Sequence, residues 1–137
     1  MSEPEPKVDL HVHSNFSDGE LFPEQLLEEA QWAGLSAIAL TDHDNIDGLA
    51  RARSAGAERS IEIVAGVELS CVHDGTEAHI LGLCIEAEDN LQIELRRMRD
   101  NRQARMAQML ERLAEFGVDI GMEELPLDNT MSLGRPH

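Results

Sequence analysis

Short apolar strands alternate with helices along the first half of this 137-residue chain, and this order restricts the fold more than any other feature. The predicted strands cover 8–12, 35–41 and 61–67, and the predicted helices between them run from Pro23 to Gly34 and from about Asp47 to Ala57. Two strands joined through a helix usually lie parallel, with a right-handed crossover. The sequence therefore predicts an α/β fold built on a mainly parallel sheet.

A hairpin and a long helix are expected to follow. Asp74 and Gly75 form the pair that is typical of tight hairpin turns, and they precede a fourth apolar strand at 78–84. The longest helical pattern covers 90–116 and stops at Gly117, with a further helical turn expected over 122–125.

Composition restricts the environment of the chain. No apolar run approaches the roughly 20 residues of a membrane span, and the acidic, proline-rich residues 1–6 form a disordered lead-in that is unlike a signal peptide. Cys71 and Cys84 are expected to be buried free thiols, as in the reducing cytoplasm. A net charge of −16 argues against an anionic membrane partner or a surface for long nucleic acids.

The first strand carries two histidines on one predicted face. His11 and His13 alternate with aliphatic residues and lie about 6.5–7 Å apart along the strand, at ~3.3 Å per residue. Two imidazoles at that spacing can bind one cation, and Asp18 adds an oxygen ligand just after the strand. The alternative is a strand with two solvent-facing histidines.

Further polar side chains follow the next strands. His43 and Glu68 come directly after the second and third strands, and the carboxyl ends of parallel strands meet at one edge of a sheet. Taken singly, each could be a solvated loop residue. Taken together, six residues predict a metal cluster: His11, His13, Asp18, His43, Glu68 and His79. Imidazole and carboxylate ligands suit Mn²⁺, Fe²⁺ or Zn²⁺, and Asp42 and Asp44 are candidates for orienting the imidazoles from outside the cluster.

Six of the eleven basic residues lie between Arg96 and Arg112, on the long helix. At ~100° per residue, Arg102 and Arg105 fall within the apolar stripe of this helix and Arg99 falls on its border. These side chains either pair with acidic residues or point into the cleft and bind a phosphate group. Arg96, Arg97 and Arg112 lie off the stripe, on a face expected to be solvated.

The motifs of the chain resemble those of the PHP (polymerase and histidinol phosphatase) domain, over essentially all of Val8 to His137. Within that family the chain is most similar to the stand-alone phosphoesterases that act on nucleoside 3′,5′-bisphosphates and on the 5′ ends of short RNAs. Five motifs carry the resemblance, in order: His11-Val-His13, Asp18-Gly19, Thr41-Asp42-His43-Asp44, Gly66-Val67-Glu68 and His79.

The resemblance implies a distorted (β/α)7 TIM-like barrel with a helical insertion and a cluster of up to three divalent ions (Mn, Fe or Zn). By the same resemblance, His11, His13 and Glu68 hold one ion. Asp18 and His43 hold a second, and Glu68 and His79 a third. The residues implied in binding the phosphate and nucleotide of the substrate are Arg99, Arg102, Arg105, Arg135 and His137.

The chain corresponds to the N-terminal part of such a domain. Residues 7–88 are expected to form the first part of the barrel, and 89–137 the helical insertion and the start of the return to the barrel. A further histidine and a terminal Asp-x-His pair of the family pattern are absent, so the chain looks truncated.

The expected reaction is hydrolysis, by metal-bound hydroxide, of a phosphate ester of a nucleotide or of a short 5′-phosphorylated RNA. The alternatives are a phosphatase of a small metabolite such as histidinol phosphate, and an inactive PHP module.

Overall fold

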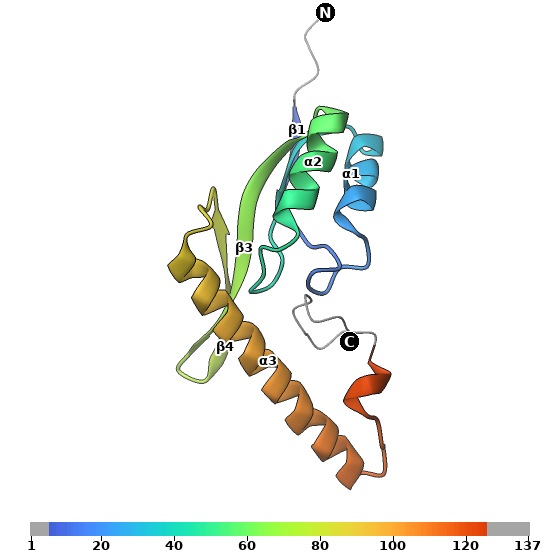
Figure 1. Cartoon of the computed structure of the whole chain (residues 1–137), viewed down its shortest axis with the longest axis vertical. Helices are drawn as coiled ribbons and strands as arrows, with labels where there is room; N and C mark the ends of the chain where they lie inside the picture. The colour runs from blue at the N-terminus through green and yellow to red at the C-terminus, as the bar shows by residue number, and fades with distance from the viewer. Residues whose placement is uncertain (1–5, 126–137) are drawn as a thin grey trace, which may run out of the picture.

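The computed structural model describes residues 6–125 of the chain. The elements in chain order (Figure 1) are β1 (Lys7–Val12), α1 (Pro23–Trp32), β2 (Leu35–Leu40), α2 (Leu49–Arg59), β3 (Glu62–His73), β4 (Thr76–Leu83), α3 (Asp89–Glu115) and the 3-10 helix η1 (Met122–Glu124).

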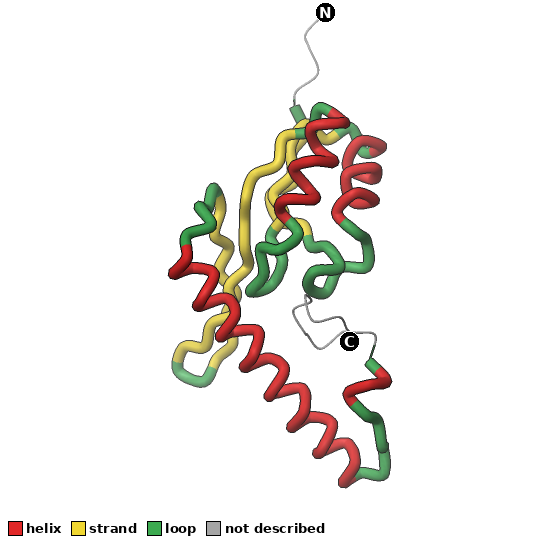
Figure 2. The backbone as a smooth tube through the Cα atoms, in the orientation of Figure 1, coloured by secondary structure: helices red, strands yellow, loops and turns green. Residues whose placement is uncertain are grey.

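The four strands form one sheet in the order β1-β2-β3-β4. The first two pairs are parallel, and β3 and β4 form an antiparallel hairpin. α1 and α2 lie side by side against one face of the sheet, and the sheet curls along the length of β3 (Figure 2). This confirms the predicted α/β fold with a mainly parallel sheet, which here has the shape of a curled half-barrel.

The main hydrophobic core lies between this sheet and the two helices, and α2 faces it mostly with small side chains. Gly56 on α2 shows how closely the helix approaches, because a Cβ there would lie 2.7 Å from the carbonyl oxygen of Ile61 and from the side chain of Ile63. The core consists of Leu27, Ala30, Ile38, Leu40, Leu49, Ala52, Ala55, Ile61 and Ala65.

Local signals located most boundaries correctly. Pro23 begins α1, and the helix stops before Gly34, which has a φ of 72° that glycine adopts without strain. The predicted hairpin turn is present at Asp74 and Gly75, which both have a positive φ. Gly117, at φ 83°, follows the end of α3.

β3 differs from its prediction. We expected it to end at residue 67, but it continues to His73 because it pairs with β4 from Gly66 and Leu83 to His73 and Thr76. Glu68 therefore lies within a strand rather than after its end.

Two further expectations are corrected. Cys71 is only half-buried and Cys84 is exposed, because both lie in or beside the hairpin, away from the core, so the prediction of buried thiols is wrong. We expected the side chains of β1 to alternate regularly between the two faces of the sheet. The pairing of β1 with β2 instead shifts register between Asp9 and Val12, and the side chains of these two residues line the same cavity beside α1.

α3 runs away from the layer formed by α1 and α2 (Figure 1), so its apolar stripe is only partly covered. Among the described residues of this 27-residue helix, Leu95 and Met106 are buried, whereas Leu113 near its end is exposed. Within residues 6–125, no helix is both long and apolar enough to cross a membrane.

Candidate metal centre

The loop after β1 returns Asp18 to the side of His13. Ser14 accepts hydrogen bonds at its carbonyl oxygen from the amides of Ser17, at 3.1 Å, and of Gly19, at 3.0 Å, so the loop is compact. A Cβ on Gly19 would lie 2.4 Å from the carbonyl oxygen of His13, so only glycine allows this close approach. The conformation of the loop therefore depends on the Asp18-Gly19 pair.

Backbone pairing places His43 beside Glu68. The amide of Asp44 donates to the carbonyl oxygen of Glu68 at 2.9 Å, and the amide of Glu68 donates to the carbonyl oxygen of Asp42 at 3.2 Å. These bonds extend the parallel pairing of β2 and β3 beyond the end of β2. His79 comes from β4, where it lies opposite Ser70, on the same face of the sheet as Glu68.

The carboxylate of Glu68 is the centre of the cluster. Its Oε2 lies 3.0 Å from Nε2 of His11 and 2.8 Å from Nε2 of His13. Its Oε1 lies 3.0 Å from Nδ1 of His79. Nδ1 of His43 is farther away, at 3.6 Å from Oε2. One buried carboxylate is thus surrounded by four imidazoles, two from the strands β1 and β4 and two from the loops that follow β1 and β2.

Asp18 joins two of the same imidazoles from the other side. Its Oδ1 lies 2.7 Å from Nδ1 of His13, and its Oδ2 lies 3.5 Å from Nε2 of His43. His13 and His43 therefore each face a carboxylate with both ring nitrogens.

The pKa values reflect this crowding. Hydrogen bonds with His13 and His43 hold the pKa of Asp18 well below its ordinary value. Burial opposes ionisation of Glu68, but the hydrogen bond with His11 and the neighbouring imidazoles lower its pKa. Burial opposes protonation of His13, yet its hydrogen bond with Asp18 and the nearby carboxylates raise its pKa. The site thus favours ionised carboxylates, which is the state in which they bind cations.

The arrangement fits divalent cations. Three groups of three residues offer ligand atoms within 4.8 Å of one another, and these share His13, His43 and Glu68. Nδ1 of His43 is buried and has no hydrogen-bond partner within the described part of the chain, which leaves its lone pair available to an ion. The three groups are His11, His13 and Glu68; His13, Asp18 and His43; and His43, Glu68 and His79. That these six residues bind metal stays a prediction.

From its position next to His43 we expected Asp42 to orient an imidazole, but the hydrogen bonds of its carboxylate are to the loop after β1. Its buried carboxylate accepts hydrogen bonds from the amide of Ser14 at 2.7 Å, from the hydroxyl of Ser14 at 2.7 Å and from that of Ser17 at 2.6 Å. Asp42 thereby holds the loop that carries His13 and Asp18. We assigned the two serines no role from sequence, because nothing local indicates which acid a buried hydroxyl will bond.

Asp44 also has a different partner from the one expected. It adopts a left-handed conformation, with a φ of 49°, and its buried carboxylate accepts hydrogen bonds from the amide of Ser70 at 2.8 Å and from Nε of Arg102 at 2.6 Å. Arg102 also donates to the hydroxyl of Ser70. Asp44 therefore joins β3 to α3 instead of orienting an imidazole.

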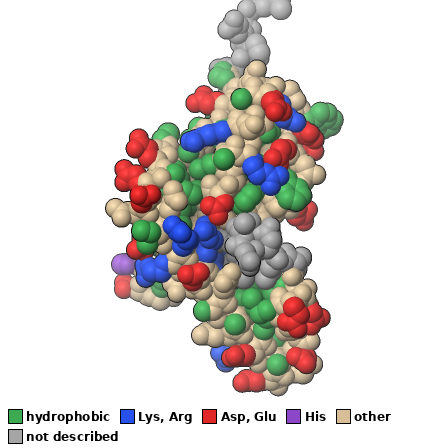
Figure 3. Space-filling view, in the orientation of Figure 1, with side chains coloured by type: hydrophobic (Ala, Val, Ile, Leu, Met, Phe, Trp, Pro, Cys, Tyr) green, Lys and Arg blue, Asp and Glu red, His purple; other side chains and the backbone are tan. Residues whose placement is uncertain are grey.

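The other predicted substrate-binding residues are partly accounted for. Arg99 donates to Oδ1 of Asn45 at 3.0 Å, and Arg105 lies 3.7 Å from Glu77. The sequence allowed two interpretations of these arginines, pairing with acidic residues or binding of phosphate. Their contacts in the structure are with acidic and polar residues, and the binding of phosphate stays a prediction. Arg135 and His137 lie outside the described residues. Basic side chains gather beside the first half of α3 (Figure 3).

Three of the curated proteins that resemble the chain in sequence have described activities. A phosphoribosyl 1,2-cyclic phosphate 1,2-diphosphodiesterase of Eggerthella lenta is 36% identical over 130 residues, which are 93% of this chain and 48% of that protein. A 3′,5′-nucleoside bisphosphate phosphatase of Chromobacterium violaceum is 40% identical over 112 residues, which are 81% of this chain and 39% of that protein. The 5′-3′ exoribonuclease Rnm of Escherichia coli is 34% identical over 118 residues, which are 84% of this chain and 40% of that protein.

A solved structure from Bifidobacterium adolescentis, described as a metal-dependent phosphoesterase, shares the fold. Its TM-score is 0.87 at 27% identity, over 98% of this chain and 49% of that one. The chain thus spans half or less of the length of the proteins that it matches. The family described as PHP domain matches residues 9–93, a segment that contains all six predicted metal ligands.

Proposed function

Because this chain belongs to the PHP domain family, we propose that it forms the metal-binding part of a phosphoesterase that acts on a nucleotide or on a short 5′-phosphorylated RNA. One observation carries the proposal. Six predicted ligands from separate segments of the chain converge around the buried carboxylate of Glu68. The proposal includes the complete (β/α)7 barrel of which residues 7–88 are the first part, with 89–137 as the helical insertion and the start of the return to the barrel.

His11, His13 and Glu68 would hold one ion, and Asp18 and His43, with His13 shared, a second. His79 would hold a third together with His43 and Glu68. A divalent ion at such a site supplies Lewis acidity, which activates water and neutralises charge on phosphate oxygens. We propose Mn²⁺, Fe²⁺ or Zn²⁺ as the bound ion, since all three suit imidazole and carboxylate ligands.

The residues of the chain prepare the site. The shared carboxylate of Glu68 sets the spacing of three imidazoles, and Asp42 holds the backbone of Ser14 between the ligands His13 and Asp18. Such support from outside the ligand shell keeps ligands oriented when the site is empty.

A nucleotide substrate is favoured by two of the relatives, which are a nucleoside bisphosphate phosphatase and an exoribonuclease. The Eggerthella lenta relative is a cyclic phosphate diphosphodiesterase, so a phosphoribosyl cyclic phosphate is the competing substrate in the assay below. Histidinol phosphate serves as the comparison for a small-metabolite phosphatase.

The test separates metal binding from activity. Isothermal titration of the full chain with Mn²⁺ should show tight binding that Glu68→Gln weakens at least tenfold, because Glu68 contacts three of the imidazoles. Glu62→Gln is the matched control, since Glu62 lies exposed at the start of the same strand. Equal affinities for the two variants would contradict the assignment of the metal centre.

Activity is then measured as phosphate release from a nucleoside 3′,5′-bisphosphate, a 5′-phosphorylated RNA, a phosphoribosyl cyclic phosphate and histidinol phosphate. Hydrolysis of the first two, lost in Glu68→Gln, is the expected result. Hydrolysis of only one of the last two would overturn the proposed substrate class.

A further inference from the structure

A cation–π contact connects α2 to the loop that carries His13 and Asp18. The guanidinium of Arg51 lies 5.7 Å from the ring centroid of Phe16 and 5.3 Å from that of Phe22. Both distances are within the range in which a cation is attracted to an aromatic ring. Phe16 lies between His13 and Asp18 in the chain, and Phe22 directly precedes α1. One side chain of α2 thus contacts both the middle and the far end of this loop.

Arg51 is held in a fixed orientation by α1. Its Nε and Nη2 donate to the two carboxylate oxygens of Glu24, each at 2.8 Å. A paired arrangement of this kind fixes the plane of the guanidinium as well as its position. Glu24 lies in the first turn of α1, and α1 and α2 lie side by side (Figure 1). The face that Arg51 presents to the two rings is therefore set by the packing of the two helices.

Phe16 is closely packed on its other contacts. A Cβ on Gly48, directly before α2, would lie 3.0 Å from Cδ2 of Phe16 and 3.3 Å from Oδ2 of Asp42. The carbonyl oxygen of Phe16 accepts a hydrogen bond from Nδ2 of Asn45 at 2.8 Å. The segment from β2 to α2 therefore holds Phe16 both through its ring and through its backbone.

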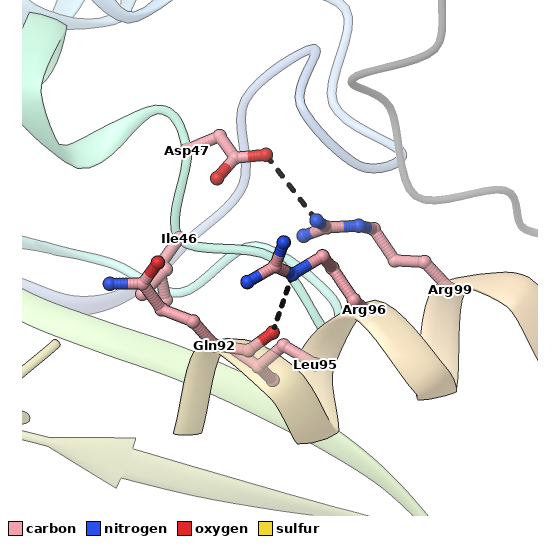
Figure 4. A pocket seen from close by; sticks show the side chains of 6 residues that line it. All are labelled: Ile46, Asp47, Gln92, Leu95, Arg96 and Arg99. Carbon is pink, nitrogen blue, oxygen red and sulfur yellow. Dashed lines mark hydrogen bonds and ion pairs between the residues drawn. The ribbon is translucent and has the colours of Figure 1, made fainter. Parts of the chain in front are cut away.

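Asn45 is itself buried and fixed. Its Oδ1 accepts hydrogen bonds from the amide of Asp47 and from the guanidinium of Arg99, each at 3.0 Å. Arg99 also lies 3.6 Å from the carboxylate of Asp47, and Figure 4 shows this ion pair between α3 and the loop before α2. The support behind Phe16 is thus rigid, because its own polar groups are bonded.

We propose that Arg51 is a positioning residue for the candidate metal centre, on which it acts through Phe16. Asp42 holds the buried side of the loop through two serines. Arg51 adds a second, partly exposed anchor through the ring of Phe16, so that Asp18 stays beside His13. The inference rests on the proposed function, and it adds a side chain of α2 to those that set the affinity for metal.

Isothermal titration of the full chain with Mn²⁺ tests the effect on affinity. Arg51 is about half exposed, so we expect the variants at this position to stay folded. Arg51→Gln should weaken binding about fivefold, and Arg51→Lys, which keeps a cation beside the rings, should restore most of the affinity. Arg53→Gln is the matched control, because Arg53 is exposed on the same helix and the change in net charge is the same.

Hydrogen exchange of the metal-free chain reports on the loop itself. The amides of Ser17 and Gly19 bond the carbonyl oxygen of Ser14 within the loop. Arg51→Gln should speed the exchange of these two amides about fivefold relative to the amides of β2, which lies inside the sheet. A general loss of stability would speed both sets of amides by the same factor and would contradict a positioning role.

A double-mutant cycle with Phe16→Leu isolates the contact between the ring and the guanidinium. If the ring transmits the effect, Arg51→Gln should weaken the binding of Mn²⁺ no further in a chain that already carries Phe16→Leu. Additive effects of the two changes, or equal weakening by Arg51→Gln and Arg53→Gln, would overturn the inference.

The two measurements separate this inference from the proposed function. Unchanged affinity for Mn²⁺ and unchanged exchange of the loop in Arg51→Gln would overturn the role of Arg51 and leave the metal centre standing. Faster exchange of the loop in Arg51→Gln, in a chain whose wild type binds no Mn²⁺, would support Arg51 as the anchor of the loop and count against the proposed function.

Discussion

Replacing Asp42 tests how the loop that carries His13 and Asp18 is held. Only 1% of Asp42 is exposed, and its carboxylate accepts three hydrogen bonds from the amide and hydroxyl of Ser14 and the hydroxyl of Ser17. Ser14 and Ser17 are themselves fully buried. No water is therefore at hand to replace the carboxylate.

The magnitude follows from these three bonds. Asp42→Ala leaves three buried donors without an acceptor, at about 1–3 kcal/mol each, so we expect the free energy of unfolding to fall by about 3–5 kcal/mol after partial relaxation. Asp42→Asn keeps Oδ1, which accepts two of the three bonds, removes the charge, and replaces Oδ2 by an NH2 group to which the hydroxyl of Ser14 must turn as an acceptor. We expect it to cost about 1–2 kcal/mol, the difference between charged and neutral hydrogen bonds.

Urea unfolding followed by circular dichroism measures both values. Asp74→Asn is the control, because Asp74 is exposed in the hairpin turn and Asn tolerates its positive φ. It should change the free energy of unfolding by less than about 0.5 kcal/mol. A loss below about 1 kcal/mol for Asp42→Ala would refute the reasoning, since it would mean that the three donors find other partners.

Three further predictions concern other contacts. Arg102→Gln should lower the free energy of unfolding by about 2–4 kcal/mol in the same assay, because it leaves the buried carboxylate of Asp44 without its cation, whereas Arg112→Gln should have little effect. Gly56→Ala should cost about 1–3 kcal/mol and lower the Tm, because the added Cβ collides with Ile61 and Ile63, and an unchanged Tm would contradict this packing. Glu24→Gln should destabilise the chain at neutral pH but not near pH 2. The hydrogen bonds from Arg51 lower the pKa of Glu24 in the folded protein below its value in the unfolded chain. The stability that these bonds add is therefore present at pH values above the pKa of Glu24 in the unfolded chain. It is lost as the pH falls through the lower pKa of Glu24 in the folded protein. A difference between wild type and Glu24→Gln that persists to pH 2 would contradict this linkage.

The segments that carry the predicted metal ligands could be located from sequence because they follow local rules. His11 lies on a short strand and His13 directly after it, His43 follows a buried strand, and parallel strands bring their carboxyl ends to one edge. Glu68 was placed correctly beside them even though its strand continues further than expected. The extension depends on pairing with β4, and the length of a hairpin is set by cross-strand contacts that a single strand does not reveal.

The partners of Asp42 and Asp44 could not be predicted in this way. Asp42 bonds residues 25 and 28 positions away, and Asp44 bonds Arg102, 58 positions away. Nothing in the helical period of α3 distinguishes an arginine that reaches a buried carboxylate from one in solvent. The stripe on α3 shows the same limit, because amphipathicity predicts a helix, whereas the burial of Leu95 but not of Leu113 depends on what packs against each half.

These distant contacts connect α3 to the candidate metal centre. The amide of Asp44 bonds the carbonyl oxygen of Glu68, and its carboxylate bonds the amide of Ser70 and the guanidinium of Arg102. One residue thus fixes α3 to the strand segment that carries Glu68, the central predicted ligand. A shift of α3 must break a buried ion pair or move the backbone next to Glu68. We therefore expect Arg102→Gln to weaken the binding of Mn²⁺ as well as the fold, because Arg102 holds Asp44, whose amide bonds the backbone of Glu68. Unchanged affinity for Mn²⁺ in a folded Arg102→Gln protein would show that the helix and the cluster are independent.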